Sequence, residues 1–281
     1  MRLAVIAART SIVRDGVAFD VATNSDGRFG PSPGAVYEEW SAFRSWADSA
    51  PLAGGVPFVA AEADAPSPAP RQLFAIGLNY RAHQIESGFE EPSEPMVFTK
   101  FASSITGPVA DLRLFTDQVD WEVEAAVVIG VTAYQVAAED AWAHVAGVTA
   151  AQDFSARDVQ MRPAGTPQFS LGKSFPGFTP MGPALVTPDE FDDCDDIAVR
   201  CVINGVTVQE SSTADLIFPV PELVAYLSAV LPLLPGDVIL TGTPAGVGLG
   251  RNPPSYLVPG DDVVTIVGDQ TLQHTAIANP T

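Results

Sequence analysis

Cysteine is nearly absent from this sequence: Cys194 and Cys201 are the only two among 281 residues. Neither forms a metal-ligand spacing with a histidine, and two cysteines are too few for the disulfide framework of a small secreted domain. The sequence therefore predicts free thiols and gives no support to a cysteine-based zinc site.

Long apolar runs are missing as well. No stretch approaches the roughly 20 apolar residues that a membrane helix needs. The apolar run within residues 1–10 is too short for a signal peptide, and Arg9 interrupts it. We therefore predict a cytoplasmic protein that has no membrane partner.

Positive charge is scarce, and lysine is the scarcest cation. The chain carries 14 Lys and Arg residues against 34 Asp and Glu, a formal charge of −20, and its only lysines are Lys100 and Lys173. Nucleic acids and anionic membranes are unsuitable partners, because binding phosphate needs a basic surface. A small acidic substrate requires local positive charge. Two lysines retained among arginines can reflect chemistry, although chance can also leave two.

The chain divides into two regions by pattern. Residues 1–65 predict a small N-terminal α/β domain with a helix at 37–50, and the segment 62–70, rich in Pro and Ala, predicts a linker. Residues 70–281 predict a larger, β-rich domain. Its strand-like runs include 122–129, 197–203, 237–241 and 262–267, with a hairpin turn at 204–205 and helices at about 137–147 and 220–231.

Two acids sit beside a long apolar run at residues 120–130. In a strand, Glu122 and Glu124 point to one face, and that face should be largely buried. An unpaired buried carboxylate costs several kcal/mol. A divalent cation shared with a third acid, Asp153, would resolve the conflict, because carboxylate oxygens suit Mg²⁺, Ca²⁺ or Mn²⁺. The alternatives are that one acid binds a proton, or that both glutamates are solvated on a half-exposed strand.

Six segments occur in an order that resembles the fumarylacetoacetate hydrolase family. They are GLNYRAHQIE (77–86), DWEVEAAVVIG (120–130), DFSARDVQ (153–160), GKSFPGFTPMGP (172–183), VINGVTVQ (202–209) and LPGDVILTGTPAGVG (234–248). The resemblance spans about residues 71–278. It implies an α+β, β-rich fold: a mixed β-sandwich roll that forms the catalytic domain at 70–281, preceded by the small N-terminal domain.

The resemblance also implies the metal site. Glu122, Glu124 and Asp153 match the family's three metal carboxylates, and the metal in relatives is usually Mg²⁺, sometimes Mn²⁺ or Ca²⁺. His83 and Glu86 match a catalytic His–Glu pair carried on a short helical lid. Their spacing of three residues lets them meet on one helical turn, and a carboxylate that fixes an imidazole tautomer suits a general base.

Other residues match positions that contact the substrate. Arg157, Gln160 and the catalytic Lys173 match groups that hold the oxo groups and the developing negative charge. Thr243 matches a contact to the substrate carboxylate. Lys100 matches a lysine near the family's site without an assigned role.

Two departures from the family's pattern are Pro176, where many relatives have an acid, and Phe101, where many have proline. The first bears on the polarity of the pocket floor, and so on the distal group of the substrate. His144 and His274 lack a comparable setting and are predicted to be structural.

The function that the resemblance implies is hydrolysis of a C–C bond in a 2,4-dioxo acid, such as an acylpyruvate, through a metal-bound enolate. The alternatives on the same site are isomerisation or tautomerisation of 2-oxo and 2-hydroxydienoate acids, and decarboxylation of oxaloacetate. A non-catalytic metal-binding module is a remote alternative, because it would be expected to lack one or more of the four residues His83, Glu86, Arg157 and Lys173. Relatives are commonly homodimers, and we predict the same here.

Overall fold

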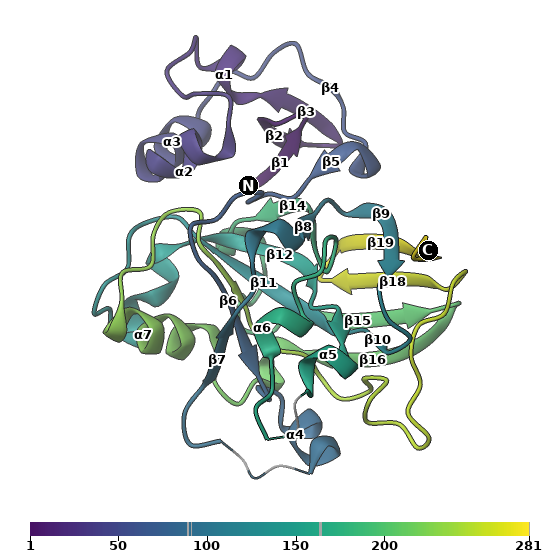
Figure 1. The fold of residues 1–281 in the computed structure, drawn as a ribbon. Helices are drawn as coiled ribbons and strands as arrows, with labels where there is room; N and C mark the ends of the chain where they lie inside the picture. The colour runs from purple at the N-terminus through teal and green to yellow at the C-terminus, as the bar shows by residue number, and fades with distance from the viewer. Residues whose placement is uncertain (89, 91, 163–164, 281) are drawn as a thin grey trace.

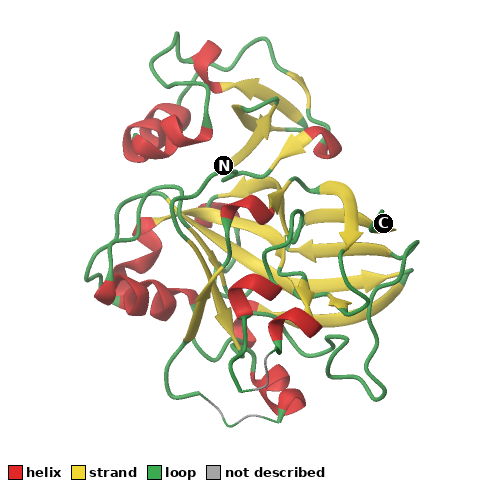
Figure 2. Ribbon diagram, in the orientation of Figure 1, coloured by secondary structure: helices red, strands yellow, loops and turns green. Residues whose placement is uncertain are grey.

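A computed structural model describes residues 1–88, 90, 92–162 and 165–280 and is dominated by strands (Figure 1; Figure 2). The largest sheet has the order β4-β3-β2-β1-β14-β12-β11-β17-β6-β7, with β5 beside β1 and β8 beside β14. Its strands are β1 (Arg2–Ile6), β2 (Arg9–Arg14), β3 (Val17–Asp20), β4 (Val56–Pro57), β5 (Ala63–Asp64), β6 (Leu73–Gly77), β7 (Met96–Thr99), β8 (Ile105–Thr106), β11 (Val123–Ile129), β12 (Val145–Gln152), β14 (Thr179–Val186) and β17 (Val238–Leu240).

A second sheet has the order β16-β15-β18-β19-β9, and a short ribbon pairs β10 with β13. Its strands are β9 (Val109–Leu114), β15 (Ala198–Ile203), β16 (Val206–Ser212), β18 (Asp262–Val267) and β19 (Gln270–Ala278), and the ribbon consists of β10 (Val119–Asp120) and β13 (Ser155–Ala156). The turn at 204–205 joins β15 to β16, as the sequence predicts.

Helices are short and lie around the sheets (Figure 2). The α-helices are α1 (Val21–Asn24), α2 (Pro33–Glu38), α3 (Trp40–Ala47), α4 (Arg81–Ser87), α5 (Arg157–Gln160), α6 (Phe169–Gly172) and α7 (Val220–Val230). The 3₁₀ helices are η1 (Ala60–Glu62), η2 (Ala102–Ser104), η3 (Ala138–His144), η4 (Pro188–Glu190) and η5 (Thr213–Asp215). Figure 1 shows α4 at the end of the molecule away from residues 1–65.

Strand β11 explains how the layers form. Its side chains alternate between two hydrophobic clusters, so both faces of the strand are buried. Val127 and Ile129 join the cluster that contains α7 and the inner face of the second sheet. Ala126 and Val128 join the cluster that contains α2 and α3. The predicted β-rich α+β sandwich is confirmed.

The N-terminal region packs closely on the rest of the chain. Strand β1 pairs with β14, so the large sheet continues from one region into the other. A Cβ on Gly130 would lie 2.6 Å from the ring of Trp40, so glycine is needed there for α3 to approach β11. Within the expected linker, buried Ser67 donates a hydrogen bond to the carbonyl of Gly236 at 2.6 Å. The domain division between 65 and 70 stays a prediction.

Two predicted helices differ from the observed ones. The helix expected at 37–50 is replaced by α2 and α3, because Glu39 adopts a non-helical conformation with φ −115° and ψ 29°. Helix α2 begins earlier, where the Ser32 side chain accepts a hydrogen bond from the backbone of Ala35. The helix expected at 137–147 is the single 3₁₀ segment η3, after which β12 begins at Val145.

Candidate active site

Strands β11 and β12 bring three acidic side chains together. The strands run antiparallel with Val123 opposite Gln152. The backbone N–H of Asp153 donates to the carbonyl of Glu122 at 2.9 Å. One carboxylate oxygen from each of Glu122, Glu124 and Asp153 lies within 4.8 Å of the others. The three residues are 6%, 1% and 0% exposed, which does not fit the alternative of solvated glutamates on a half-exposed strand.

Both lysines of the sequence bind the aspartate of this group. Lys173 Nζ lies 2.7 Å from Glu122 Oε2 and 2.6 Å from Asp153 Oδ2. Lys100 Nζ lies 2.5 Å from Asp153 Oδ1 and donates to the carbonyl of Phe178 at 2.8 Å. The scarcity of lysine in the sequence is therefore a signal for this site, and it extends to Lys100.

Arg157 lies at the start of α5 and completes the positive side of the site. Its Nη2 lies 2.7 Å from Glu122 Oε1, and its Nε lies 2.8 Å from Asp120 Oδ2. Its Nη1 donates to Gln160 Oε1 at 2.9 Å. Asp120 is fully buried and also accepts the backbone N–H of Gly248 at 2.7 Å. Sequence reasoning missed Asp120, which stands two residues before Glu122 in the same quoted segment.

Burial and neighbouring charges shift the pKa values of the two glutamates in opposite directions. Burial raises the pKa of Glu122, but the charges of Lys173 and Arg157 outweigh burial and lower this pKa to about 2. Burial, and then the neighbouring carboxylates, raise the pKa of Glu124 well above its ordinary value. Glu124 accepts the backbone N–H of Gly242 at 2.7 Å, and it forms no ion pair with a lysine or arginine within the described part of the chain. A bound cation would supply the missing counter-charge.

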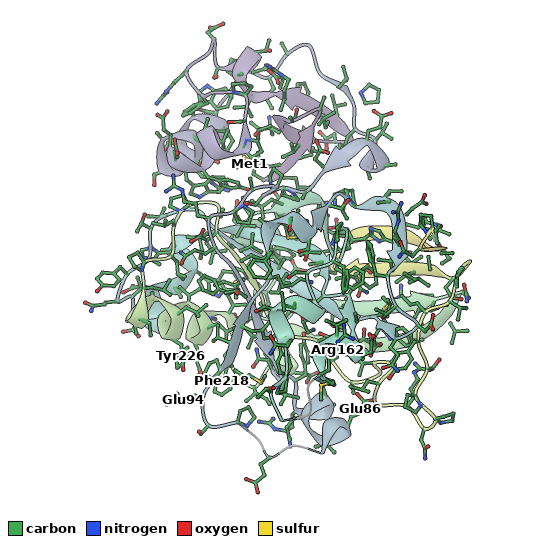
Figure 3. All side chains as sticks on the ribbon, in the orientation of Figure 1. Met1, Glu86, Glu94, Arg162, Phe218 and Tyr226 are labelled. Carbon is green, nitrogen blue, oxygen red and sulfur yellow. The ribbon has the colours of Figure 1, made fainter. Side chains whose placement is uncertain are left out.

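Helix α4 carries the His83–Glu86 pair at the end of the molecule away from residues 1–65, where Figure 3 labels Glu86. His83 Nδ1 lies 3.2 Å from Glu86 Oε2. The backbone N–H of Gly246 donates to both carboxylate oxygens of Glu86 at 3.1 Å. His83 is close enough to Glu122 to contribute to its lowered pKa. Because Nδ1 faces Glu86, the other ring nitrogen, Nε2, is available to a reactant.

Thr243 lies beside the acids, but its hydroxyl has protein partners. It donates to the carbonyl of Val123 at 2.9 Å and accepts from Gln209 Nε2 at 2.8 Å. The predicted contact between Thr243 and a substrate carboxylate stays a prediction. Gln209 was not found by sequence reasoning, although it is the last residue of the segment VINGVTVQ (202–209) that carries part of the family resemblance.

Aromatic rings border the site near Lys173. The ring centroid of Phe98, on β7, lies 5.4 Å from Lys173 Nζ and 5.5 Å from the ring of Phe169, on α6. The two departures from the family's pattern, Pro176 and Phe101, both have exposed side chains. They replace none of the buried charged groups.

The donor set fits a hard divalent cation. Three buried carboxylates provide oxygen ligands, which Mg²⁺, Mn²⁺ and Ca²⁺ prefer, whereas zinc sites favour nitrogen and sulfur. Glu124, which has no direct ion pair among the described residues, points to the same need. A second group of candidate ligands, at residues 193–195, is mostly exposed and lies outside this buried setting.

Comparison with known proteins places these features in a family. The family described as "Fumarylacetoacetate (FAA) hydrolase C-terminal" matches residues 72–276. A Homo sapiens protein named oxaloacetate tautomerase FAHD2A, mitochondrial, is 48% identical over 201 residues, which cover 71% of this chain and 64% of that protein. The match therefore spans less than two thirds of this relative's length.

Two crystal structures extend the likeness to the whole chain. A Mycobacterium smegmatis protein given the designation HpcE has 48% identity and a TM-score of 0.96, with 100% of both chains covered. Maleylpyruvate hydrolase from Sphingobium sp. SYK-6, in complex with manganese (II) ion and pyruvate, has 26% identity and a TM-score of 0.81, again with 100% of both chains covered.

Proposed function

The chain belongs to the fumarylacetoacetate hydrolase family, and from this premise we propose that it is a metal-dependent tautomerase that interconverts the keto and enol forms of a small 2-oxo dicarboxylic acid such as oxaloacetate. The observation that carries the proposal is the position of Lys173, whose ammonium group bonds to Glu122 and Asp153 in the site that also holds His83. Such a site combines a base with fixed positive charge. The name of the human relative supports tautomerisation over the hydrolysis that the sequence favours.

Glu122, Glu124 and Asp153 would hold the cation, for which we propose Mg²⁺ or Mn²⁺. When bound, the cation would act as a Lewis acid toward the carboxylate and the adjacent oxo group of the substrate. The protein's own charges add to this effect. The sequence predicts that Arg157 and Gln160 contact the substrate, and the hydrogen bond between their side chains sets the direction of both groups.

The proton transfer is assigned to His83. In the keto form, Nε2 of His83 accepts a proton from the carbon next to the oxo group, and the electron pair moves onto the oxo oxygen. Lys173 and Arg157 stabilise the resulting negative charge, because their positions are fixed before the reaction. The protonated imidazole then gives up this proton to the oxygen, which yields the enol and restores neutral His83. One proton leaves carbon and one joins oxygen, and no water is consumed.

Hydrolysis of an acylpyruvate-like C–C bond is the second candidate. The His83–Glu86 pair also suits the activation of water, and the similar maleylpyruvate hydrolase structure supports this reading. Isomerisation of hydroxydienoates and decarboxylation use the same enolate chemistry. The non-catalytic alternative is disfavoured, because all four residues whose loss it predicts are present and lie at the site: His83, Glu86, Arg157 and Lys173.

A substrate panel tests the proposal. Protein freed of metal with EDTA and reloaded with Mg²⁺ or Mn²⁺ is assayed with enol oxaloacetate, acylpyruvates and keto oxaloacetate, which report tautomerisation, cleavage and decarboxylation. We expect the highest kcat/KM for tautomerisation, which is monitored as the loss of the enol absorbance. A higher kcat/KM for acylpyruvate cleavage would replace the proposal with its second candidate. No activity on any substrate would favour the non-catalytic alternative.

Assembly and location stay predictions. A homodimer and a cytoplasmic location are expected, and the human relative is named as mitochondrial. Among the residues that the structure describes, no helix has both the length and the apolar character needed to cross a membrane.

A further inference from the structure

Gln209 lies on β16 beneath the site, where its amide closes a ring of hydrogen bonds. Its Oε1 accepts the backbone N–H of Val123 at 3.0 Å, and its Nε2 donates to Thr243 Oγ1 at 2.8 Å. Thr243 in turn donates to the carbonyl of Val123 at 2.9 Å. Because a backbone N–H can only donate and a carbonyl can only accept, the ring has one possible direction. The orientation of the Gln209 amide is therefore fixed by the residue between Glu122 and Glu124.

The ring joins two segments that meet along their whole length, residues 120–124 and the loop 242–249. Gln209 Nε2 also donates to the carbonyl of Pro244 at 2.8 Å. Four more hydrogen bonds connect the same segments. They are Gly242 N–H to Glu124 at 2.7 Å, Trp121 Nε1 to the carbonyl of Gly246 at 3.1 Å, and the N–H groups of Gly248 and Leu249 to Asp120 at 2.7 and 2.9 Å. The loop therefore follows the segment that carries two of the triad acids.

The same loop holds the lid helix. The backbone N–H of Gly246 donates to both carboxylate oxygens of Glu86 at 3.1 Å. Gly246 has a φ of +107°, and a Cβ there would meet the carbonyl of Val208. The loop thus packs closely against β16 at Val208, the residue before Gln209. From that position, the N–H of Gly246 donates to Glu86 on α4.

We propose that Gln209 is a positioning residue that couples the carboxylate triad to the His83–Glu86 pair through the loop 242–249. It touches no reacting group. Without its amide, the loop loses its two hydrogen bonds to Gln209, at Thr243 and Pro244, and keeps the Thr243 bond to Val123. Gly246 then holds Glu86 less firmly. The inference rests on the proposed function only in treating the triad and the pair as two halves of one site.

The chain offers a matched control in Gln152, on β12. This second buried glutamine accepts the neighbouring backbone N–H, that of Glu122, at 2.8 Å. Its Nε2 donates to Thr265 Oγ1 at 2.9 Å, on the second sheet. Gln152 therefore supports the same segment and has the same chemistry. Among the described residues, its side chain bonds to Glu122, Cys201 and Thr265 and not to the loop.

Hydrogen exchange measured by mass spectrometry on the full chain without substrate tests the coupling. In Gln209→Met, exchange in α4 should accelerate about tenfold, because a loosened loop weakens the Gly246 hydrogen bonds that dock Glu86 by about the worth of one hydrogen bond. Exchange in α4 of Gln152→Met should stay within about twofold of the parent, because local openings that share no contacts are independent. Strand β2 should be unchanged in both variants, which separates a local effect from general unfolding.

Thr243→Val breaks the same ring at its hydroxyl with little change of shape, and it should accelerate α4 exchange as Gln209→Met does. It also serves as the test if Gln209→Met does not fold. The proposal is overturned if neither ring variant accelerates α4 exchange, or if Gln152→Met accelerates it equally. Because no substrate is present, these results are independent of which reaction the enzyme catalyses, and the substrate panel can fail while the coupling holds.

Discussion

Lys100 and Asp153 form an ion pair at 2.5 Å in which both side chains are completely buried. Burial, helped by the like charge of Lys173, lowers the pKa of Lys100 although Asp153 acts to raise it. Lys173 binds the other oxygen of Asp153 and also Glu122, and these two carboxylates outweigh burial and raise its pKa. The two lysines therefore pair with different numbers of acids. Lys100 pairs with Asp153 only, whereas Lys173 bridges two proposed metal ligands, Glu122 and Asp153.

Replacing Lys100 by methionine should strongly destabilise the protein. The change leaves the buried acids with one cation fewer, and breaking a buried pair typically costs about 3–5 kcal/mol. The free energy of unfolding, measured in urea at neutral pH, would show the loss. Arg71→Met is the matched control, because Arg71 pairs with Glu38 at 3.5 Å with both side chains exposed. Exposed pairs contribute little, so an equal effect in the two variants would contradict the structural importance of Lys100.

Replacing Glu124 by glutamine should weaken divalent-metal binding. The substitution keeps the shape of the side chain and replaces a carboxylate ligand by a neutral amide. Titration calorimetry with Mn²⁺ on protein dialysed against a chelator should show a loss of about a hundredfold or more, since loss of an outer partner alone costs about 10–100-fold. Asp193→Asn changes an acid of the exposed group and should leave affinity unaltered. Unchanged affinity in Glu124→Gln would remove this residue from the metal site.

Much of the fold could be predicted because its signals are local. The hairpin turn is an example: Asn204 and Gly205 have φ values of 51° and 79°, which asparagine and glycine tolerate best. The break at Glu39 could not be predicted, because it interrupts a continuous apolar pattern and is set by packing on the sheet. The 3₁₀ form of η3 could not be predicted either, because η3 packs against α7, which lies far along the chain.

The candidate site could be predicted only in part, for a related reason. Glu122 and Glu124 were found from spacing within a strand, and Lys173 from its rarity and from the resemblance. Asp120 and Gln209 were missed because their contacts are long-range: Asp120 binds Gly248 across 128 residues, and Gln209 binds Val123 across 86. Nothing in a local pattern records which distant backbone group a buried amide will meet.

His274 should make the free energy of unfolding fall in mild acid. It is 1% exposed on β19, and burial lowers its pKa from the ordinary 6.5 to about 4. Between these values the unfolded chain binds a proton that the folded chain does not, so the unfolding free energy falls as pH decreases through this window. The loss from this group is about 2 kcal/mol between pH 7 and pH 5.

Urea unfolding at both pH values would measure this effect. His274→Leu should reduce the difference between pH 7 and pH 5 by about that 2 kcal/mol, because the titrating group is gone. His144→Gln, at a half-buried position, controls for the loss of an imidazole as such. A parent-like pH dependence in His274→Leu would show that other groups cause the acid sensitivity.

Replacing His83 by alanine separates proton transfer from metal binding. The variant removes the proposed base and keeps Glu122, Glu124 and Asp153, so its affinity for Mn²⁺ should match that of the parent in calorimetry. Tautomerisation should fall by roughly 10²–10⁴-fold in kcat, the usual contribution of a positioned general base, with little change in KM. Added imidazole should restore part of the rate, because the cavity left by the side chain admits a small base.

His144→Gln is the control for this prediction: His144 lies outside the site, so the variant should retain full activity. If His83→Ala keeps its rate within about threefold with metal still bound, another group moves the proton, and Lys173 becomes the first residue to test, since it lies against the same acids.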